Sequence, residues 1–128
     1  MTKILEGLKI LVLEDEFLIA MDVEQLCRDN GADHVTIIRS LDEIDHQATH
    51  EFDAAVVDVM LGGASTLEFA AQLRDAKRPF VFASGYTDNE ELARSFPDVA
   101  LISKPYSESD LIDAIASARA RVTASGCA

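Results

Sequence analysis

Residues 9–16 have the sequence KILVLEDE, in which an apolar run meets three consecutive acids. An apolar run of this length without a polar break is typical of a strand covered on both faces. Glu14, Asp15 and Glu16 then stand at the carboxyl end of that strand. The segment therefore predicts the first strand of a parallel sheet, with carboxylates at its edge.

Strand and helix patterns alternate from this segment to the C-terminus. Further strands are predicted at 35–38, 52–57, 79–84 and 99–103, and helices at 16–30, 40–50, 65–76, 87–96 and 107–122. Boxes of the Ser/Thr-x-x-Glu/Asp type mark four helix starts, at Ser40, Ser65, Thr87 and Ser107. Five strands alternating with five helices require right-handed βαβ crossovers, so we expect an α/β fold with a parallel sheet.

Length and charge limit the classes of protein to consider. The chain has 128 residues, which suits a single domain over residues 1–128, with a core of about 7–123 and a frayed tail at 124–128. The formal charge of -12 disfavours direct binding to nucleic acid or to an anionic membrane. The two cysteines are too sparse for a disulfide framework or a zinc site. We expect a cytoplasmic protein, either a monomer or a weak homodimer.

The residues at the strand ends predict that acids, a hydroxyl and an amine gather at one edge of the sheet. Besides Glu14 and Asp15, this edge would carry Asp58 after the third strand, Ser84 after the fourth and Lys104 after the fifth. Clustered carboxylates repel each other, and a hard cation such as Mg²⁺ relieves that repulsion. Asp58 would then be a nucleophile toward a phosphoryl group, with Ser84 and Lys104 contacting its oxygens.

This arrangement resembles the receiver domain of two-component response regulators. The resemblance rests on KILVLEDE, on Val56-Val57-Asp58, on Ser84 and on Lys104-Pro105, and it covers residues 7–123. It implies a flavodoxin-like, doubly wound five-stranded sheet, (βα)5, with strand order 2-1-3-4-5.

The resemblance also implies a role for each matching residue. Asp58 would be the phosphoacceptor, and Mg²⁺ would be held by Glu14, Asp15, Asp58 and the backbone carbonyl of Met60. Ser84 would be the switch hydroxyl, Lys104 would pair with the phosphate, and the Lys104–Pro105 peptide bond would be cis. The expected partner is a histidine kinase or a phosphotransfer protein. The chain would not be an enzyme beyond its own phosphotransfer and autodephosphorylation.

Residues 79–86, PFVFASGY, are similar to the PFxFATGY signature of the "FAT GUY" single-domain receivers. That group is linked to HWE or HisKA2-type histidine kinases. Leu101 stands where many receivers have the aromatic that moves on activation, and Tyr86 supplies an aromatic nearby. We therefore expect Ser84 and Tyr86 to switch the surface formed by 89–95 and the fifth strand.

Two other functions remain open. A receiver that only binds partners would be expected to lose Asp58 or Lys104, and both are present. An aspartyl-nucleophile phosphatase of the haloacid-dehalogenase type would have an acid two residues after the nucleophile. Met60 occupies that position, and the chain is too short for a cap domain.

Overall fold

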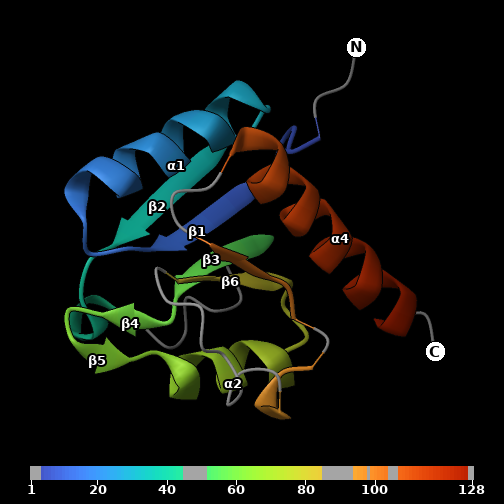
Figure 1. Cartoon of the computed structure of the whole chain (residues 1–128). Helices are drawn as coiled ribbons and strands as arrows, with labels where there is room; N and C mark the ends of the chain where they lie inside the picture. The colour runs from blue at the N-terminus through green and yellow to red at the C-terminus, as the bar shows by residue number, and fades with distance from the viewer. Residues whose placement is uncertain (1–3, 45–51, 85–93, 98, 104–106, 127–128) are drawn as a thin grey trace.

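A five-stranded parallel sheet forms the centre of the computed structural model, which describes residues 4–44, 52–84, 94–97, 99–103 and 107–126 (Figure 1). The strands are β1 (Lys9–Leu13), β2 (His34–Ile38), β3 (Ala54–Asp58), β6 (Phe80–Ser84) and β7 (Leu101–Ser103). Their order is β2-β1-β3-β6-β7, and every neighbouring pair is parallel. This is the predicted order 2-1-3-4-5, counted in chain order.

Helices cover both faces of the sheet, as a doubly wound fold requires. α1 (Phe17–Asp29) and α4 (Glu108–Gly126) lie on one face, and α2 (Leu67–Asp75) lies on the other (Figure 1). α4 continues past residue 123, where we expected the tail to fray. The predicted helix at 40–50 begins as the short 3-10 helix η1 (Leu41–Glu43), and 45–51 lie outside the described residues.

Alternate residues of each strand face opposite layers of the core. On β1, Ile10 and Val12 pack in the layer under α1 and α4, whereas Leu11 and Leu13 pack in the layer under α2. All four side chains are at most 1% exposed. The unbroken apolar run of β1 is therefore explained by burial on both faces.

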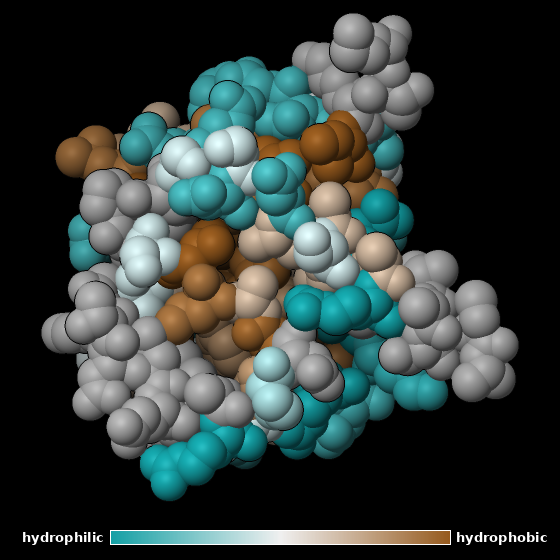
Figure 2. Space-filling model, turned by 45° about the vertical axis from the view of Figure 1, so that its right-hand side comes forward, coloured by the Kyte–Doolittle hydropathy of each residue, from teal (hydrophilic) through white to brown (hydrophobic). Residues whose placement is uncertain are grey.

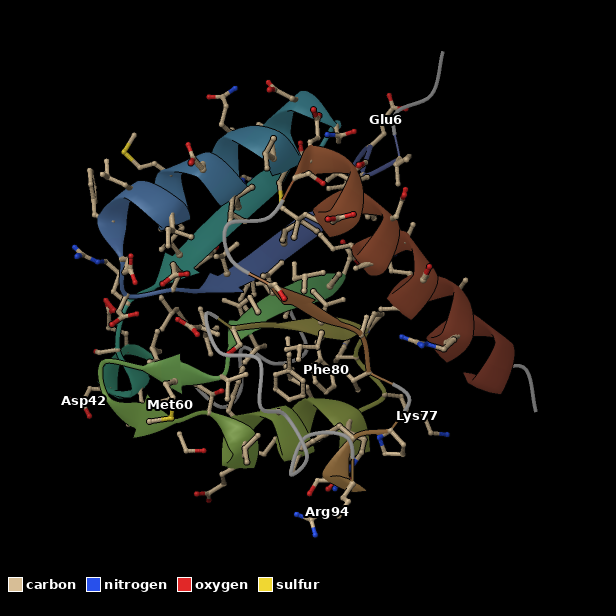
Figure 3. All side chains as sticks on the ribbon, in the orientation of Figure 1. Glu6, Asp42, Met60, Lys77, Phe80 and Arg94 are labelled. Carbon is tan, nitrogen blue, oxygen red and sulfur yellow. The ribbon has the colours of Figure 1, made fainter. Side chains whose placement is uncertain are left out.

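Three phenylalanines fill the layer between the sheet and α2. Phe80, labelled in Figure 3, and Phe82 come from β6 and belong to the cluster on this side. Phe96 joins them from the segment before β7. The ring centroids are 5.2 to 6.0 Å apart with edge-to-face geometry. Such pairs add stabilisation beyond the burial of apolar area.

A small hairpin follows β3, in a stretch for which no strand was predicted. β4 (Met60–Leu61) pairs antiparallel with β5 (Ala64–Ser65). The connecting residues Gly62 and Gly63 both have positive φ, 59° and 84°. Two positive φ angles are the requirement of a type I′ turn, and a Gly-Gly pair is a signal for it. The turn signal is present in the sequence, although no hairpin was predicted from it.

The start of α2 also differs from the predicted capping box. The box required the Ser65 hydroxyl to accept the amide of Glu68, three residues on. The Ser65 Oγ instead accepts the amide of Leu67, at 3.2 Å. The predicted box at Ser107 is half confirmed, because its Oγ accepts the amide of Asp110 at 3.2 Å.

α1 and α2 end in the same backbone motif with different residues at its left-handed position. That position is Gly31 (φ 100°) after α1 and Lys77 (φ 58°) after α2. In both helices, this residue and its successor donate their amides to carbonyls of the last turn, at 2.9 to 3.0 Å. A side chain at a left-handed position is strained, whereas glycine is not.

We therefore expect Lys77→Gly to raise the free energy of unfolding by roughly 0.5–1 kcal/mol, since relief of strain exceeds the added entropy of the unfolded chain. The reciprocal change, Gly31→Lys, should lower it by about 1 kcal/mol at the equivalent position. Urea unfolding of both variants measures the two effects. A loss of stability in Lys77→Gly would contradict the assigned strain.

On the face shown in Figure 2, hydrophobic residues gather in a hollow near the centre, and hydrophilic residues lie above and below it. Lys77 and Arg94 project outward at the α2 side of the molecule (Figure 3). Within the described part of the chain, no helix combines the length and apolar character needed to cross a membrane.

Candidate functional site

Three carboxylates gather where β1 and β3 end at the same edge of the sheet. One oxygen each of Glu14, Asp15 and Asp58 lies within 4.8 Å of the others. The strands place them there, because Leu13 is opposite Val57 and the next residue of each strand is an acid. Glu14 is only 1% exposed and Asp58 only 7%. Three carboxyl groups are thus held close together, and two of them are shielded from water.

Backbone amides hold two of these carboxylates in place. The Glu14 Oε2 accepts the amide of Glu16 at 3.1 Å. The Asp15 Oδ2 accepts the amide of Gly62, at the tip of the β4–β5 hairpin, at 3.2 Å. The hairpin that the sequence analysis missed is therefore attached to the acidic edge through its glycine turn.

Arg39 is a residue of this edge that the sequence analysis did not select. It directly follows β2, and its guanidinium donates to the carbonyl oxygen of Asp15 at 3.4 Å. The same guanidinium lies over the ring of Phe17, 5.8 Å from the centroid. The strand-end rule that selected the acids would also have selected Arg39, had it been applied to the second strand.

Ser84 lies on the strand next to Asp58. Asp58 is paired with Ala83, so Ser84 is the following residue on β6, and it is buried with 4% exposure. Ser84 is itself paired with Ser103 on β7. Lys104, the Lys104–Pro105 bond and Tyr86 lie outside the described residues, so the expectations for them stay predictions.

Met60 stands on β4, two residues after Asp58. Its side chain is 42% exposed and projects from the hairpin away from the five-stranded sheet (Figure 3). The exposed side chain takes no part in the acidic edge, and the metal ligand expected from Met60 is its backbone carbonyl, an assignment that stays a prediction.

Thr66 is a second residue that the sequence analysis missed. Its side chain is fully buried, and its hydroxyl lies 2.6 Å from the carbonyl oxygen of Asp58 and 3.0 Å from that of Val59. In the sequence, Thr66 is an inner residue of the box that starts at Ser65. The hydroxyl contacts the Asp58 backbone only because the hairpin brings the two segments together, so the sequence pattern alone does not indicate this contact.

Cys27 plays no part in this edge. It belongs to α1 and is fully buried on the core side of that helix, and burial raises the pKa of its thiol to about 12. The thiol therefore remains protonated and unreactive at neutral pH. Cys27 is therefore a small core residue and not a reactive group.

The donor atoms at the edge fit Mg²⁺. The grouped ligand atoms are all carboxylate oxygens, and no sulfur or imidazole nitrogen belongs to the group. Mg²⁺ prefers hard oxygen donors and binds through one or two carboxylates together with water and a phosphoryl oxygen. A divalent cation would also offset the repulsion among three close carboxylates.

Comparison with known families gives one match over most of the chain. The family described as "Response regulator receiver domain" matches residues 10–116. A curated relative, the transcriptional regulatory protein PdtaR of Mycobacterium tuberculosis, is 29% identical over 111 residues. That alignment covers 84% of this chain and 54% of the relative, so the chain spans about half the length of the curated relatives it matches.

Solved structures share the fold. The signal receiver domain of a modulated diguanylate cyclase from Desulfovibrio desulfuricans G20 has a TM-score of 0.80 at 23% identity, covering 94% of this chain and 99% of that one. The response regulator PhyR from Brucella abortus has a TM-score of 0.76 at 26% identity, covering 96% of this chain and 53% of that one.

Proposed function

Since this chain belongs to the response regulator receiver domain family, we propose that it accepts a phosphoryl group on Asp58 and signals through the phosphorylated form. The observation that carries the proposal is the convergence of Glu14, Asp15 and Asp58, with their oxygens within 4.8 Å. The proposed role is that of a signalling domain in a two-component system, with Mg²⁺ as its cofactor.

The proposed reaction uses groups of this edge. A carboxylate oxygen of Asp58 forms a bond to phosphorus while the bond between phosphorus and the donor imidazole nitrogen breaks. The electron pair leaves with that nitrogen, and Asp58 becomes an acyl phosphate. Glu14, Asp15, Asp58 and the Met60 carbonyl would hold Mg²⁺, which neutralises phosphoryl oxygens when bound. Ser84 and Lys104 would contact the transferred group as hydrogen-bond donor and as cation.

Exposed apolar residues on α1 support a protein as the phosphodonor. Phe17, Leu18 and Met21 are 57%, 76% and 49% exposed, and their spacing makes them neighbours on the helix surface. α1 begins two residues after Asp15, so this surface adjoins the acidic edge. A donor protein that places its phosphoryl group on Asp58 would cover both at once.

We expect Leu18→Glu to slow phosphotransfer from the kinase about tenfold, since a charge placed against an apolar partner surface costs more than 1 kcal/mol and 1.4 kcal/mol is tenfold. Ile4→Glu is the matched control. Ile4 is also an exposed apolar residue, at 51%, but it lies beside the opposite end of α1. Quenched-flow phosphotransfer measures both rates, and equal rates for the two variants would count against this surface.

The proposal extends to the partner and to the output. The similarity of residues 79–86 to the "FAT GUY" signature favours an HWE or HisKA2-type kinase. The switched surface would comprise 89–95 with β7, and Tyr86 would couple it to Ser84. The charge of -12 favours output through protein contact or onward phosphotransfer, without direct contact to nucleic acid. We also propose a cytoplasmic location and a monomer or weak homodimer.

Phosphorylation by a kinase tests the proposed function. Incubation with an HWE or HisKA2-type kinase and labelled ATP should transfer label to the chain, and EDTA added after kinase autophosphorylation should prevent the transfer. Reduction with tritiated borohydride expels the phosphate and converts the acyl phosphate to tritium-labelled homoserine, and peptide mapping should locate that tritium at position 58. Unlabelled protein with every kinase of these types would favour an interaction-only receiver, and steady phosphate release from diverse phosphomonoesters would favour a phosphatase.

A further inference from the structure

Thr66 closes the loop that begins at the phosphoacceptor. Its hydroxyl is within hydrogen-bond distance of the carbonyl oxygens of Asp58 and Val59, at 2.6 and 3.0 Å. Its amide donates to the carbonyl of Val59 at 3.1 Å. A hydroxyl has one proton to donate, so the two carbonyls share it. The chain entering the hairpin is thus joined to the chain leaving it by one fully buried side chain.

The hairpin is fixed at its other end by the acidic edge. Gly62, at the tip, donates its amide to the carboxylate of Asp15. Between tip and base, Met60 is paired with Ser65 in the antiparallel register. The backbone of Met60 therefore lies between two anchors, the Asp15 carboxylate and the Thr66 hydroxyl.

The Thr66 hydroxyl does not serve the helix that it precedes. Thr66 is the N-cap residue of α2, yet its side chain makes no capping hydrogen bond. The neighbouring Ser65 caps the amide of Leu67 instead. An N-cap threonine ordinarily accepts an amide of the first turn. Here the hydroxyl is directed back to the backbone of Asp58, so it supports the acidic edge and not the first turn of α2.

We infer that Thr66 is a positioning residue for the Mg²⁺ site, an inference that rests on the proposed function. Its hydroxyl holds the Asp58 backbone and the base of the hairpin so that the Asp58 carboxylate and the Met60 carbonyl are directed at the same cation. Groups that orient metal ligands in this way typically alter metal affinity 10–100-fold when they are removed.

Thr66→Val tests this inference, because valine keeps the shape of threonine and removes only the hydroxyl. Titration of the full chain with MgCl₂, followed by amide NMR shifts, gives the dissociation constant for Mg²⁺. We expect Thr66→Val to weaken Mg²⁺ binding about tenfold or more. Thr66→Ser, which keeps the hydroxyl, should stay within about twofold of the parent protein.

Ser65→Ala is the matched control for a purely structural effect. It removes a hydroxyl from the adjacent residue at the same helix end, so it should lower the melting temperature without changing Mg²⁺ affinity. A Mg²⁺ affinity of Thr66→Val within twofold of the parent, or an equal loss in Ser65→Ala, would overturn the inference. If Thr66→Val does not fold, Thr66→Ala replaces it with the same criteria, and Thr66→Ser remains the variant that keeps the hydroxyl.

The parent protein separates this inference from the proposed function. A parent that binds no Mg²⁺ would overturn the proposed site and the role of Thr66 with it. A parent that binds Mg²⁺, with unchanged affinity in folded Thr66 variants, would overturn the role of Thr66 alone.

Discussion

Asp58→Asn is expected to lose phosphorylation by the kinase, with the rate falling by several orders of magnitude because the nucleophile itself is removed. The amide has no anionic oxygen to attack phosphorus, and it removes one of the three grouped carboxylates. Labelled phosphate retained on the chain after acid quenching measures the effect. Circular dichroism of the variant verifies that it remains folded.

Asp53→Asn is the control for this change. Asp53 directly precedes β3, and its carboxylate accepts the amide of Lys9 at 2.8 Å. It therefore lies at the opposite end of the strand that ends at Asp58. Labelling should be unchanged in Asp53→Asn. Undiminished labelling of Asp58→Asn would show that the phosphoryl group is carried by another residue.

Phe82→Ala is expected to lower the free energy of unfolding by about 3–5 kcal/mol, because it leaves a large cavity in the core. Phe82 is 1% exposed and lies against the rings of both Phe80 and Phe96. Domains of this size have only about 5–15 kcal/mol of stability, so the variant should approach the limit of folding. Thermal unfolding should show a melting temperature lower by roughly 10–20 °C.

Phe17→Ala removes the same side chain from a position that is 57% exposed. We expect its free energy of unfolding to change by no more than about 0.5 kcal/mol. Similar losses of stability in the two variants would mean that the layer between the sheet and α2 is not packed as described.

The parallel sheet was predictable because its signal is local. β1 is a continuous apolar run that ends in acids, and helices with capping and glycine signals separate the strands. Two strands bounded by such signals have few ways to pair, since crossovers are right-handed. Strand ends were less predictable. β3 extends to Asp58, which pairs with Ala83, so the strand includes the acid that the sequence analysis placed after it.

The acidic edge was predictable for the same reason, whereas its supporting contacts were not. Glu14, Asp15 and Asp58 come together because they end adjacent parallel strands. Thr66 and Gly62 reach the edge only through the geometry of a two-residue hairpin turn. Their contacts depend on tertiary structure, and no spacing of residues in the sequence predicts these contacts.

Beryllofluoride binding, observed by fluorine NMR, tests the central claim most directly because it needs no kinase. Beryllofluoride imitates a phosphoryl group and coordinates a carboxylate oxygen. The proposed phosphoacceptor site predicts bound fluorine resonances in the parent protein with Mg²⁺, and none in EDTA or in Asp58→Asn. Absence of bound resonances from the parent with Mg²⁺, or their persistence in Asp58→Asn, would contradict the claim that Asp58 is a Mg²⁺-dependent phosphoacceptor.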